Sequence, residues 1–581
     1  MKQLSQKKNY VILLLLILSA LMLYTYFFFA KKKGYDSDEI YSYTLSNSYY
    51  KPFLEAPENW NMNYVSETAQ YLKTWISGSV FHDYITVQKG EQFAYGSVWY
   101  NQSKDVHPPF YYAVLHTICS FFPDIYSPWF ALSINYISFI LVMFLLYKLG
   151  RRWSSSTFAL FLCGFYAFSA GAVDTYTFLR MYALCTFFAL FLFSLIEIYI
   201  RTFQKKYLFF LFVITLLSSL THYYLIVFAF FLTLTTELYL LLKKNWKSFF
   251  SLGFTMLLSV ISAFCIFPAS ISHLLHSGNG FASQGMSPYY QTRYLIRLVI
   301  QQFTGITLPY LRTYFPIYAM TFLGAAAVLL LLSFYLFRKE NWAYIFYNGF
   351  KKILFHITNG FKTLIKKLSS TCSILIFTLL CLFVFYIFNL PIATMRDNSI
   401  RYLFPFYPLL CIVILYLLKC IVPSAIKHFI KVGSALLIGT VLSVNSVFFT
   451  PHCFLFNSVK LQGTQLQELP SEATYIIFVS KTFHMSNFAI LLQDAENIFF
   501  ACTDDNTDTL SDTIDTLPKD ALDYPVYFIF INYEESSILF LNEPTEADWL
   551  SMMAQLPYAN ECVFIGTDCI NSYPYKIYQI R

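Results

Sequence analysis

Charged residues are scarce in this chain of 581 residues. Asp, Glu, Lys and Arg make up 13% of it, whereas hydrophobic residues make up 57% and aromatic residues alone 20%. The length would suit several soluble domains, but the mean hydropathy of +0.51 and the aromatic content place the chain among multi-span membrane proteins instead.

The signatures of nucleotide and metal binding are also missing. The 12 cysteines show no C-x-x-C or other metal-ligand spacing, which leaves them as apolar packing residues or, outside the cell, as disulfide partners. There is no P-loop and no strand–GxGxxG–helix pattern, and Gly278, Gly280 and Gly285 fall in a loop after an apolar run. No repeat of solenoid length is present. A nucleotide-dependent mechanism therefore has no support in the sequence.

Apolar runs long enough to cross a bilayer recur along the first 450 residues. A membrane-spanning helix needs roughly 20 apolar residues. Runs near that length lie at 11–30, 128–147, 154–173, 178–200, 222–242, 249–269, 315–337, 371–390, 402–418 and 430–449. A shorter run, 207–221, leads directly into its successor. The sequence therefore predicts an α-helical polytopic membrane protein with about 11 transmembrane helices.

One further apolar segment, 108–122, differs from the predicted spans. It is short, begins with Pro108 and Pro109 and is rich in aromatic residues, which is typical of a helix that lies in the membrane interface. With this segment outside the count of spans, the first outer loop extends over about residues 31–127.

The distribution of charge predicts the orientation. Residues 451–581 hold 18 acidic and 5 basic side chains, a net charge of −13, so the total of +7 leaves +20 for the rest of the chain. That basic excess gathers in short loops on one side of the predicted spans, as cytoplasmic loops do, and not in a nucleic-acid-binding patch. We expect the N-terminus in the cytoplasm, and residues 31–127 and 451–581 outside.

Beyond Pro451 the sequence changes to the pattern of a small α/β domain. Short β-rich runs occur at 474–479, 497–501, 526–531, 562–565 and 575–580, with helix-like stretches near 484–494 and 544–555. About 130 residues can bury a core of their own. We therefore expect a transmembrane catalytic domain, 1–450, of GT-C-like architecture on the resemblance given below, and an extracytoplasmic α/β accessory domain, 451–581.

An acidic cluster follows the first apolar run. Asp36, Asp38 and Glu39 place three carboxylates within four residues. Such a cluster beside a membrane suits a carboxylate base that deprotonates an acceptor hydroxyl, with neighbours that orient it or hold a cation. A solvated acidic turn that caps the next helix accounts for the same residues equally well.

Three more clusters of ionisable residues fall on the same predicted outer face. Asp105 and His107 precede the interfacial segment, Asp174 and Arg180 lie at the mouth of the fourth predicted span, and Arg401 lies at the start of the tenth. A single arginine at the end of a span is usually an interfacial anchor. Four clusters on one side, with acids and arginines both, indicate a shared pocket for an anion.

The order of these motifs resembles that of a known enzyme superfamily. Asp38-Glu39, His107-Pro108-Pro109, Arg180-Met181-Tyr182-Ala183-Leu184, Thr221-His222-Tyr223-Tyr224 and Arg401-Tyr402 are similar to motifs of the GT-C membrane glycosyltransferases. The bacterial family-39-like branch, related to protein O-mannosyltransferases and aminoarabinose transferases, is the group it resembles most. The resemblance covers about residues 10–450. It implies an enzyme that transfers a hexose or pentose from a polyprenyl-phosphate donor to an acceptor on the outer face.

The resemblance also implies roles for single residues. Asp38 matches the acid that serves as catalytic base, with Glu39 beside it. Arg180 and Arg401 match arginines near the donor phosphate, and Tyr182 and Tyr402 accompany them. His107, His222 and Asp105 are expected to contact substrate. The chain departs from the family at 176–179, where a polar run is usual, so no acceptor-side role carries over to Asp174.

The implied chemistry needs fixed positive charge but no organic cofactor. Arginine stabilises a leaving phosphate with bidentate geometry, and a base opposite it gives a single displacement at the anomeric carbon with inversion. Asp36 and Asp38 form an Asp-x-Asp pair that would suit a divalent cation, although lipid-phosphate donors do not always need one. The expected partners are a polyprenyl-phosphate-linked sugar, an acceptor glycan, lipid or protein, and membrane lipids, with no nucleic acid.

Two other classes of protein compete with this interpretation. A transporter or flippase of lipid-linked glycans would place polar residues at mid-membrane and use paired broken helices. The predicted spans are nearly all apolar there, with Asn135 one of few exceptions. A non-catalytic envelope assembly protein would explain residues 451–581, but would leave the outer-face motifs without a role.

Overall fold

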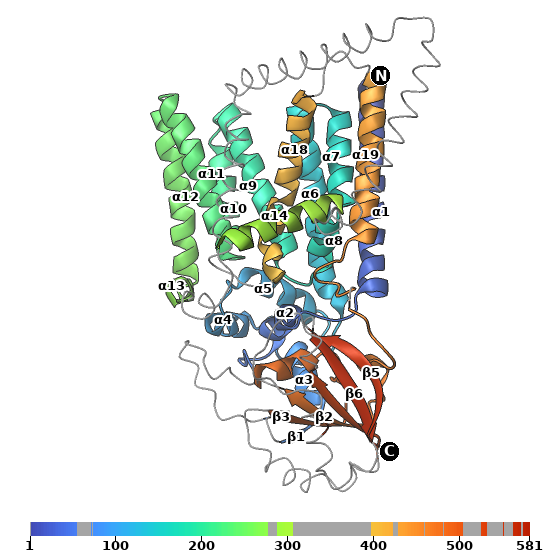
Figure 1. Cartoon of the computed structure of the whole chain (residues 1–581). Helices are drawn as coiled ribbons and strands as arrows, with labels where there is room; N and C mark the ends of the chain where they lie inside the picture. The colour runs from blue at the N-terminus through green and yellow to red at the C-terminus, as the bar shows by residue number, and fades with distance from the viewer. Residues whose placement is uncertain are drawn as a thin grey trace, which may run out of the picture.

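The structure is a computed structural model, which describes residues 2–54, 71, 74–276, 288–305, 397–421, 428–457, 459–479, 482–502, 524–531, 550, 562–570 and 573–580. A bundle of long helices stands on a smaller region of short helices and a sheet (Figure 1). The N-terminus lies at the end of the bundle away from the sheet, and the C-terminus lies at the sheet.

Long apolar helices make up the bundle. Among the described residues, seven are long and apolar enough to cross a membrane, or eight if one bent pair counts as a single span. Six of them lie in α1 (Lys2–Lys31), α6 (Pro128–Trp153), α9 (Tyr182–Thr202), α11 (Tyr223–Leu242), α12 (Trp246–Ile266) and α19 (His428–Phe449). The seventh, Ile400–Lys419, joins most of the 3₁₀ helix η1 (Asp397–Phe406) to α18 (Tyr407–Ile421). The protein is thus a multi-pass α-helical membrane protein. Two predicted spans, 315–337 and 371–390, lie outside the described residues, as do the glycines of 278–285.

Two of the predicted spans differ from a single long helix. The run 154–173 is broken into α7 (Ser156–Ala167) and α8 (Ala170–Thr177), which meet at an angle of 63°. Ser169 caps α8, its hydroxyl accepting a hydrogen bond from the Ala172 N–H, so the backbone can restart in a new direction. The run 207–221 forms α10 (Lys206–Ser219), which is shorter than the spanning helices. The break brings the C-terminal end of α8 toward the site described below.

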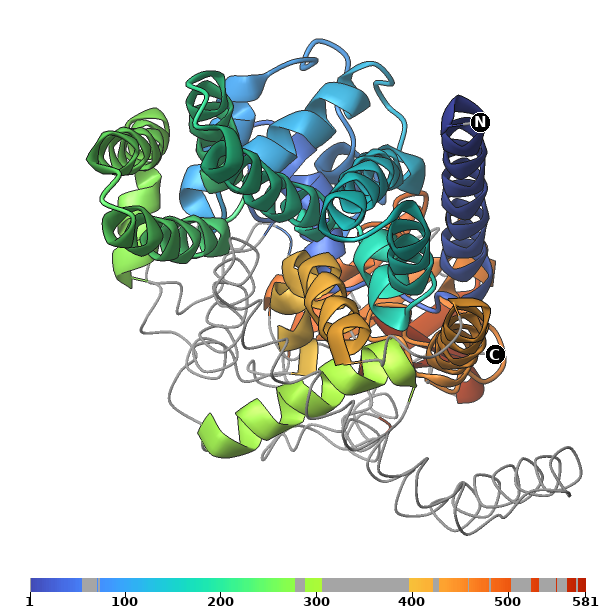
Figure 2. The same ribbon diagram turned by 90° about the horizontal axis from the view of Figure 1, so that it is seen from above.

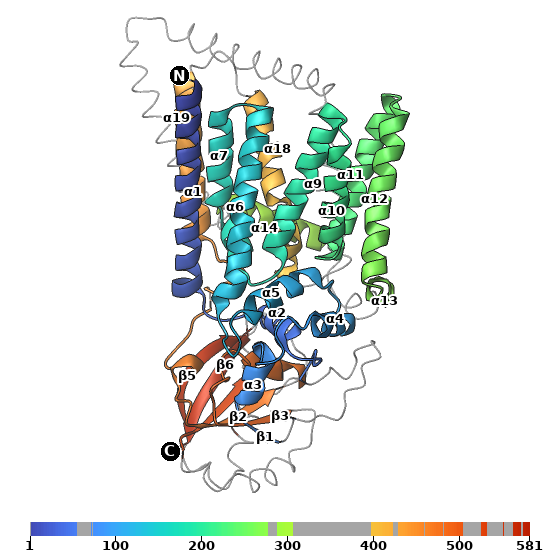
Figure 3. The same cartoon turned by 180° about the vertical axis from the view of Figure 1, so that it is seen from behind.

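The described residues of the first predicted outer loop include four helices, at the sheet end of the bundle (Figures 1 and 3). These are α2 (Ser37–Asn47), α3 (Ser79–Ile85), α4 (Tyr95–Lys104) and α5 (Phe110–Ser120). The helix expected within 108–122 is confirmed as α5. Pro109 precedes its first residue, where a fixed φ and a missing N–H suit a helix start. Tyr111 and Tyr112 are fully buried.

Shorter helices complete the region around the site. They are α13 (Ala269–His276), α14 (Pro288–Thr304) and the 3₁₀ helix η1 (Asp397–Phe406), which leads directly into α18. Seen along the bundle, α14 lies lengthwise across one side, whereas most other helices are seen end on (Figure 2). α14 therefore crosses the bundle instead of running with it.

The sheet contains all five strands that the sequence predicts. In spatial order it is β1-β3-β2-β4-β6-β5, with β2 (Thr474–Val479), β3 (Asn497–Cys502) and β4 (Val526–Ile531) parallel to one another. β5 (Cys562–Ile570) and β6 (Tyr573–Ile580) form an antiparallel pair beside β4. The helix-like stretch expected near 484–494 is only partly helical. The 3₁₀ helix η3 (Thr482–Phe488) covers its start and turns follow, because Ser486 and Asn487 favour turns over helix interiors.

The sixth strand comes from the other end of the chain. β1 (Trp75–Ile76), in the first loop, pairs antiparallel with β3, with Trp75 opposite Phe499 and Ile76 opposite Ile498. The Trp75 and Phe499 rings lie 5.1 Å apart. The sheet therefore draws strands from both sides of residue 450.

Candidate functional site

The start of α2 uses two of the three clustered carboxylates for structure. Asp36 is the N-cap, and its Oδ1 accepts a hydrogen bond of 3.0 Å from the Asp38 N–H. Glu39 Oε2 accepts in return from the Asp36 N–H at 2.9 Å, which completes a capping box. The capping expected of this cluster is thus confirmed for Asp36 and Glu39, but both side chains are buried, so the expectation of a solvated turn is wrong. It leaves Asp38 as the carboxylate that faces the site.

The Glu39 carboxylate contacts three different parts of the chain. Its carboxylate is fully buried and pairs with Lys32 Nζ at 2.8 Å, and its Oε1 accepts from the Leu179 N–H at 2.9 Å. Burial raises the pKa of Glu39, and the charge of Lys32 opposes that rise. These contacts describe a positioning residue that joins α2 to the turn before α9. The predicted catalytic role of Glu39 stays a prediction.

Asp38 lies between two arginines from distant parts of the chain. Arg180 Nη2 is 3.7 Å from Asp38 Oδ1, and Arg401 Nη1 pairs directly with Asp38 Oδ2. The Asp38 side chain is 26% exposed, whereas Arg180 and Arg401 are 2% and 19% exposed. Three motifs that the sequence predicts to share a face therefore meet at one ion-paired centre.

Arg180 is held in place by other partners. Its Nη1 donates to the Tyr112 hydroxyl at 2.6 Å and to Ser42 Oγ at 3.4 Å. Its Nε, like the Nε of Arg401, is buried and has no hydrogen-bond partner among the described residues. Both guanidinium groups thus keep a donor for a further acceptor, although Asp38 already contacts each of them.

A carboxylate–histidine pair adjoins Arg180. Asp105 Oδ2 lies 2.7 Å from His107 Nδ1, and His107 Nε2 lies 3.5 Å from Arg180 Nη2. Since a guanidinium can only donate, Nε2 is the acceptor and Nδ1 carries the proton that Asp105 accepts. Burial raises the pKa of Asp105, but His107 and Arg180 outweigh it and the net shift is downward.

An aromatic group surrounds the polar centre. The His222 ring stacks on Tyr224 at 5.3 Å and lies 5.7 Å from Tyr182, 5.9 Å from Tyr402 and 6.0 Å from His107. His222 also caps α11, because its Nδ1 accepts from the Tyr224 N–H. The predicted residues His222, Tyr182 and Tyr402 thus lie together, beside His107.

The pKa values of Asp36 and Asp38 are shifted in opposite directions. Burial raises the pKa of Asp36 to about 6, helped by the charge of Asp38. Burial would also raise the pKa of Asp38, but the charges of Arg401 and Arg180 hold it well below its usual range. Asp38 is therefore fully ionised at neutral pH, and a weak base while both arginines contact it.

The predicted cation site at Asp36 and Asp38 fits the geometry poorly. Both Asp38 oxygens face guanidinium groups, and Asp36 serves as the N-cap of α2. Within the described part of the chain, no group of three or more His, Cys, Asp and Glu side chains is placed to hold a metal ion. The cation remains a prediction.

Sequence reasoning passed over two residues of this centre. Tyr112, which hydrogen-bonds Arg180, stands five positions after His107 inside a stretch that was singled out, but nothing in its spacing points at an arginine. Lys32 follows the first apolar run as one of three consecutive lysines, and nothing in the sequence distinguishes it from the other two. Its buried pairing with Glu39 depends on how the chain folds back after α1.

Comparisons with known proteins give structural similarity only. No family model and no curated protein sequence matched the chain. The chain is similar to the crystal structure of ArnT from Cupriavidus metallidurans bound to undecaprenyl phosphate, at 11% identity, over 98% of each chain, with a TM-score of 0.47.

It is also similar to a crystal structure of the Archaeoglobus fulgidus oligosaccharyltransferase in complex with Zn and sulfate. That similarity has 12% identity and a TM-score of 0.41, and covers 96% of this chain and 72% of the other. At these scores neither similarity decides what the protein does.

Proposed function

We propose that the protein is a membrane glycosyltransferase, which moves a sugar from a polyprenyl-phosphate donor to an acceptor outside the membrane. The observation that carries the proposal is the convergence of Arg180 and Arg401 on Asp38. Two arginines beside one carboxylate, at the ends of apolar helices, suit a phosphate that arrives through the bilayer together with a base that accepts a proton.

Arg180 and Arg401 bind the donor phosphate in this proposal. Each has an Nε–H without a partner among the described residues, so an anion can add hydrogen bonds to the ones already made. A bound phosphate also competes with Asp38 for the guanidinium groups. When the phosphate neutralises the charge of the two guanidinium groups, the pKa of Asp38 rises from its lowered value, and its carboxylate becomes a stronger base. Donor binding thereby prepares the base.

The reaction is a single displacement. The acceptor hydroxyl oxygen forms a bond to the anomeric carbon while the bond from that carbon to the phosphate oxygen breaks. The hydroxyl proton passes to Asp38, and the polyprenyl phosphate leaves with its charge stabilised by the arginines. Attack opposite the leaving group inverts the anomeric configuration. The transferred group is a hexosyl or pentosyl unit.

The acceptor side is formed by His107, His222 and Asp105. The His107 Nδ1–H is fixed by Asp105, so Nε2 presents a lone pair next to Arg180. The rings of Tyr182 and Tyr402 lie 5.9 Å apart beside them, and aromatic faces of this kind suit a sugar. These side chains orient donor sugar and acceptor relative to Asp38.

The site faces the outside of the cell in this proposal, and the N-terminus faces the cytoplasm. Residues 451–581 act as an accessory domain that presents the acceptor. Its η3 helix touches the site's own helix, because Ser37 Oγ donates to Asn487 Oδ1 at 2.7 Å. Its net charge of −13 favours a neutral or basic acceptor, or a partner protein, over an acidic polymer.

The direct test is a transfer assay on the purified full-length protein. It is incubated with a panel of radiolabelled polyprenyl-phosphate sugars together with membrane fractions. We expect one donor to lose its label to an acceptor with release of polyprenyl phosphate. A folded protein that consumes none of the donors contradicts the proposal.

Transport is the second candidate, and one observation favours it. The bent pair α7–α8 is a broken span, a feature that transporters use to line substrate sites. Proteoliposomes that contain a lipid-linked sugar separate the two functions. Movement of the intact lipid-linked sugar across the bilayer without cleavage supports a flippase, whereas cleavage of the sugar–phosphate bond supports the transferase.

A further inference from the structure

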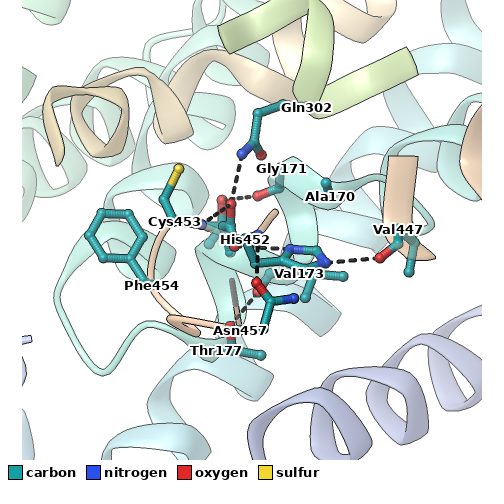
Figure 4. A network of polar contacts seen from close by, with 12 residues as sticks. Ala170, Gly171, Val173, Thr177, Gln302, Val447, His452, Cys453, Phe454 and Asn457 are labelled. Carbon is teal, nitrogen blue, oxygen red and sulfur yellow. Dashed lines mark hydrogen bonds and ion pairs between the residues drawn. The ribbon is translucent and has the colours of Figure 1, made fainter. Parts of the chain in front are cut away.

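A second buried polar cluster lies outside the candidate site and joins three parts of the chain (Figure 4). His452, in the segment that follows α19, contacts Asp174 of α8 with 3.1 Å between Nδ1 and Oδ1. Asp174 Oδ2 accepts from Gln302 Nε2 of α14 at 2.7 Å and from the Cys453 N–H at 3.4 Å. Both side chains of the His452–Asp174 pair are fully buried.

The contacts of His452 define its protonation. Its Nε2 lies 2.9 Å from the Val447 carbonyl oxygen, which can only accept, so Nε2 carries a proton. Its Nδ1 faces Asp174, whose other oxygen already accepts two N–H groups. A second proton must therefore lie between Nδ1 and Oδ1. Without it, two lone pairs would face each other in a buried site.

The surroundings of the pair favour this protonated state. The Phe27 ring of α1 packs 4.9 Å from the His452 ring, and Asn457 Oδ1 accepts from the His452 N–H. The Tyr407 phenol of α18 lies near both Asp174 and the Cys453 thiol. Of the described residues, Asp174 is the only charged group that acts on His452. Burial lowers the pKa of His452, but Asp174 and the Val447 carbonyl raise it by more.

The cluster is linked to the arginine site by the residues that follow Asp174 and those that follow His452. After Asp174 the chain reaches Phe178, whose ring stacks on Phe454 at 3.9 Å. The Phe454 carbonyl accepts from Lys32 at 2.6 Å. Lys32 pairs with Glu39, which accepts from the Leu179 N–H. The turn 178–181, which carries Arg180, is thus held between the 452–454 segment and α2.

We propose that His452 is a positioning residue, which in its protonated form fastens the 452–454 segment to α8 and so holds Arg180 for the donor phosphate. This role rests on the proposed function, because it is defined through phosphate binding. It assigns a task to Asp174, to which the family resemblance gave none.

The direction of the pH effect follows from the pair. A histidine with a raised pKa contributes fully at low pH, and its contribution is lost as the pH rises through that pKa. Donor-phosphate affinity should therefore fall on the alkaline side. Protonation of Asp38 would instead remove activity on the acidic side, so the two effects are separable.

The test measures the binding of undecaprenyl phosphate to the full-length protein in detergent, from pH 6 to pH 10. We expect the wild-type affinity to fall by roughly tenfold or more, the size expected for one charged hydrogen bond. His452→Gln, which cannot titrate, should bind weakly with no such fall. His82→Gln is the matched control, because His82 lies on α3, away from this cluster. The Nδ1 of His82 contacts Gln493. This variant should keep the wild-type profile.

Thermal unfolding without ligand, over the same pH range, gives a second readout. If His452→Gln changes the pH dependence of unfolding but not that of binding, His452 is merely structural and the proposal is overturned. An unchanged binding profile in His452→Gln overturns it too. A folded wild-type protein that binds no undecaprenyl phosphate at any pH overturns the proposed function together with this role. If His452→Gln does not fold, a flat wild-type profile still overturns the proposal.

Discussion

Asp38 and Arg401 form a direct ion pair, although one follows the first span and the other lies in a 3₁₀ helix before α18. The pair excludes the simplest view of Asp38, that of a base ready before substrate arrives. Its carboxylate is a counter-ion first, since Arg180 approaches it from the other side. In the proposed mechanism the donor phosphate takes over that task, so that deprotonation of the acceptor is coupled to donor binding.

Asp38→Asn should nearly abolish transfer. Loss of a general base typically lowers the rate by about 10²–10⁴-fold. Donor binding should persist, because the two arginines lose only a carboxylate that competes with the phosphate. Initial rates and undecaprenyl phosphate binding measure the two effects. Asp83→Asn, an exposed position on α3, is the control. Near-normal turnover in Asp38→Asn would exclude Asp38 as the base.

Arg180→Lys and Arg401→Lys should each weaken donor binding by roughly 10–100-fold. Lysine keeps the charge but loses the planar fork and the Nε–H donor, so at least one charge-assisted hydrogen bond disappears. Titration with undecaprenyl phosphate measures the change. Arg201→Lys is the matched control, because Arg201 pairs with Glu197 on α9. If both site variants bind as tightly as Arg201→Lys does, the two arginines are interfacial anchors only.

Glu39→Gln should destabilise the protein more than it impairs chemistry. The substitution leaves Lys32 buried without its charged partner, at an expected cost of about 1–3 kcal/mol in the free energy of unfolding. Its transfer rate per folded molecule should stay well above that of Asp38→Asn. Thermal unfolding and initial rates are measured together. Normal stability with abolished transfer would instead show that Glu39 is catalytic.

Cysteine labelling tests the proposed orientation. Lys89, in the first loop, is 81% exposed, and Lys247, at the start of α12, is also exposed. An impermeant thiol reagent should label Lys89→Cys in intact cells and Lys247→Cys only after lysis, against the background of the native cysteines. The reverse pattern would place the site in the cytoplasm and change the class of donor that can reach it.

Sequence patterns pointed to the residues of the candidate site more readily than to the residues that hold them in place. Asp38, His107, Arg180 and Arg401 could be named because each lies at the end of an apolar run or beside a Pro-Pro pair, and such places share one membrane face. The five strands followed from β-rich runs between turns. The Asp174–His452 pair could not be predicted, because neither residue stands in a periodic pattern. It arises only where the break between α7 and α8 meets the segment after α19.

The short strand β1 has a consequence for the order in which the protein is made. Its partner β3 is synthesised more than 400 residues later, a delay of roughly 20–80 s at about 5–20 residues per second. The hydrogen bond from Ser37 to Asn487 and that from Lys32 to Phe454 wait similarly long. The first loop is therefore without these partners during most of the synthesis of the chain. The contacts that hold the start of α2 and Lys32 in place are completed only after Phe454 and Asn487 have been made.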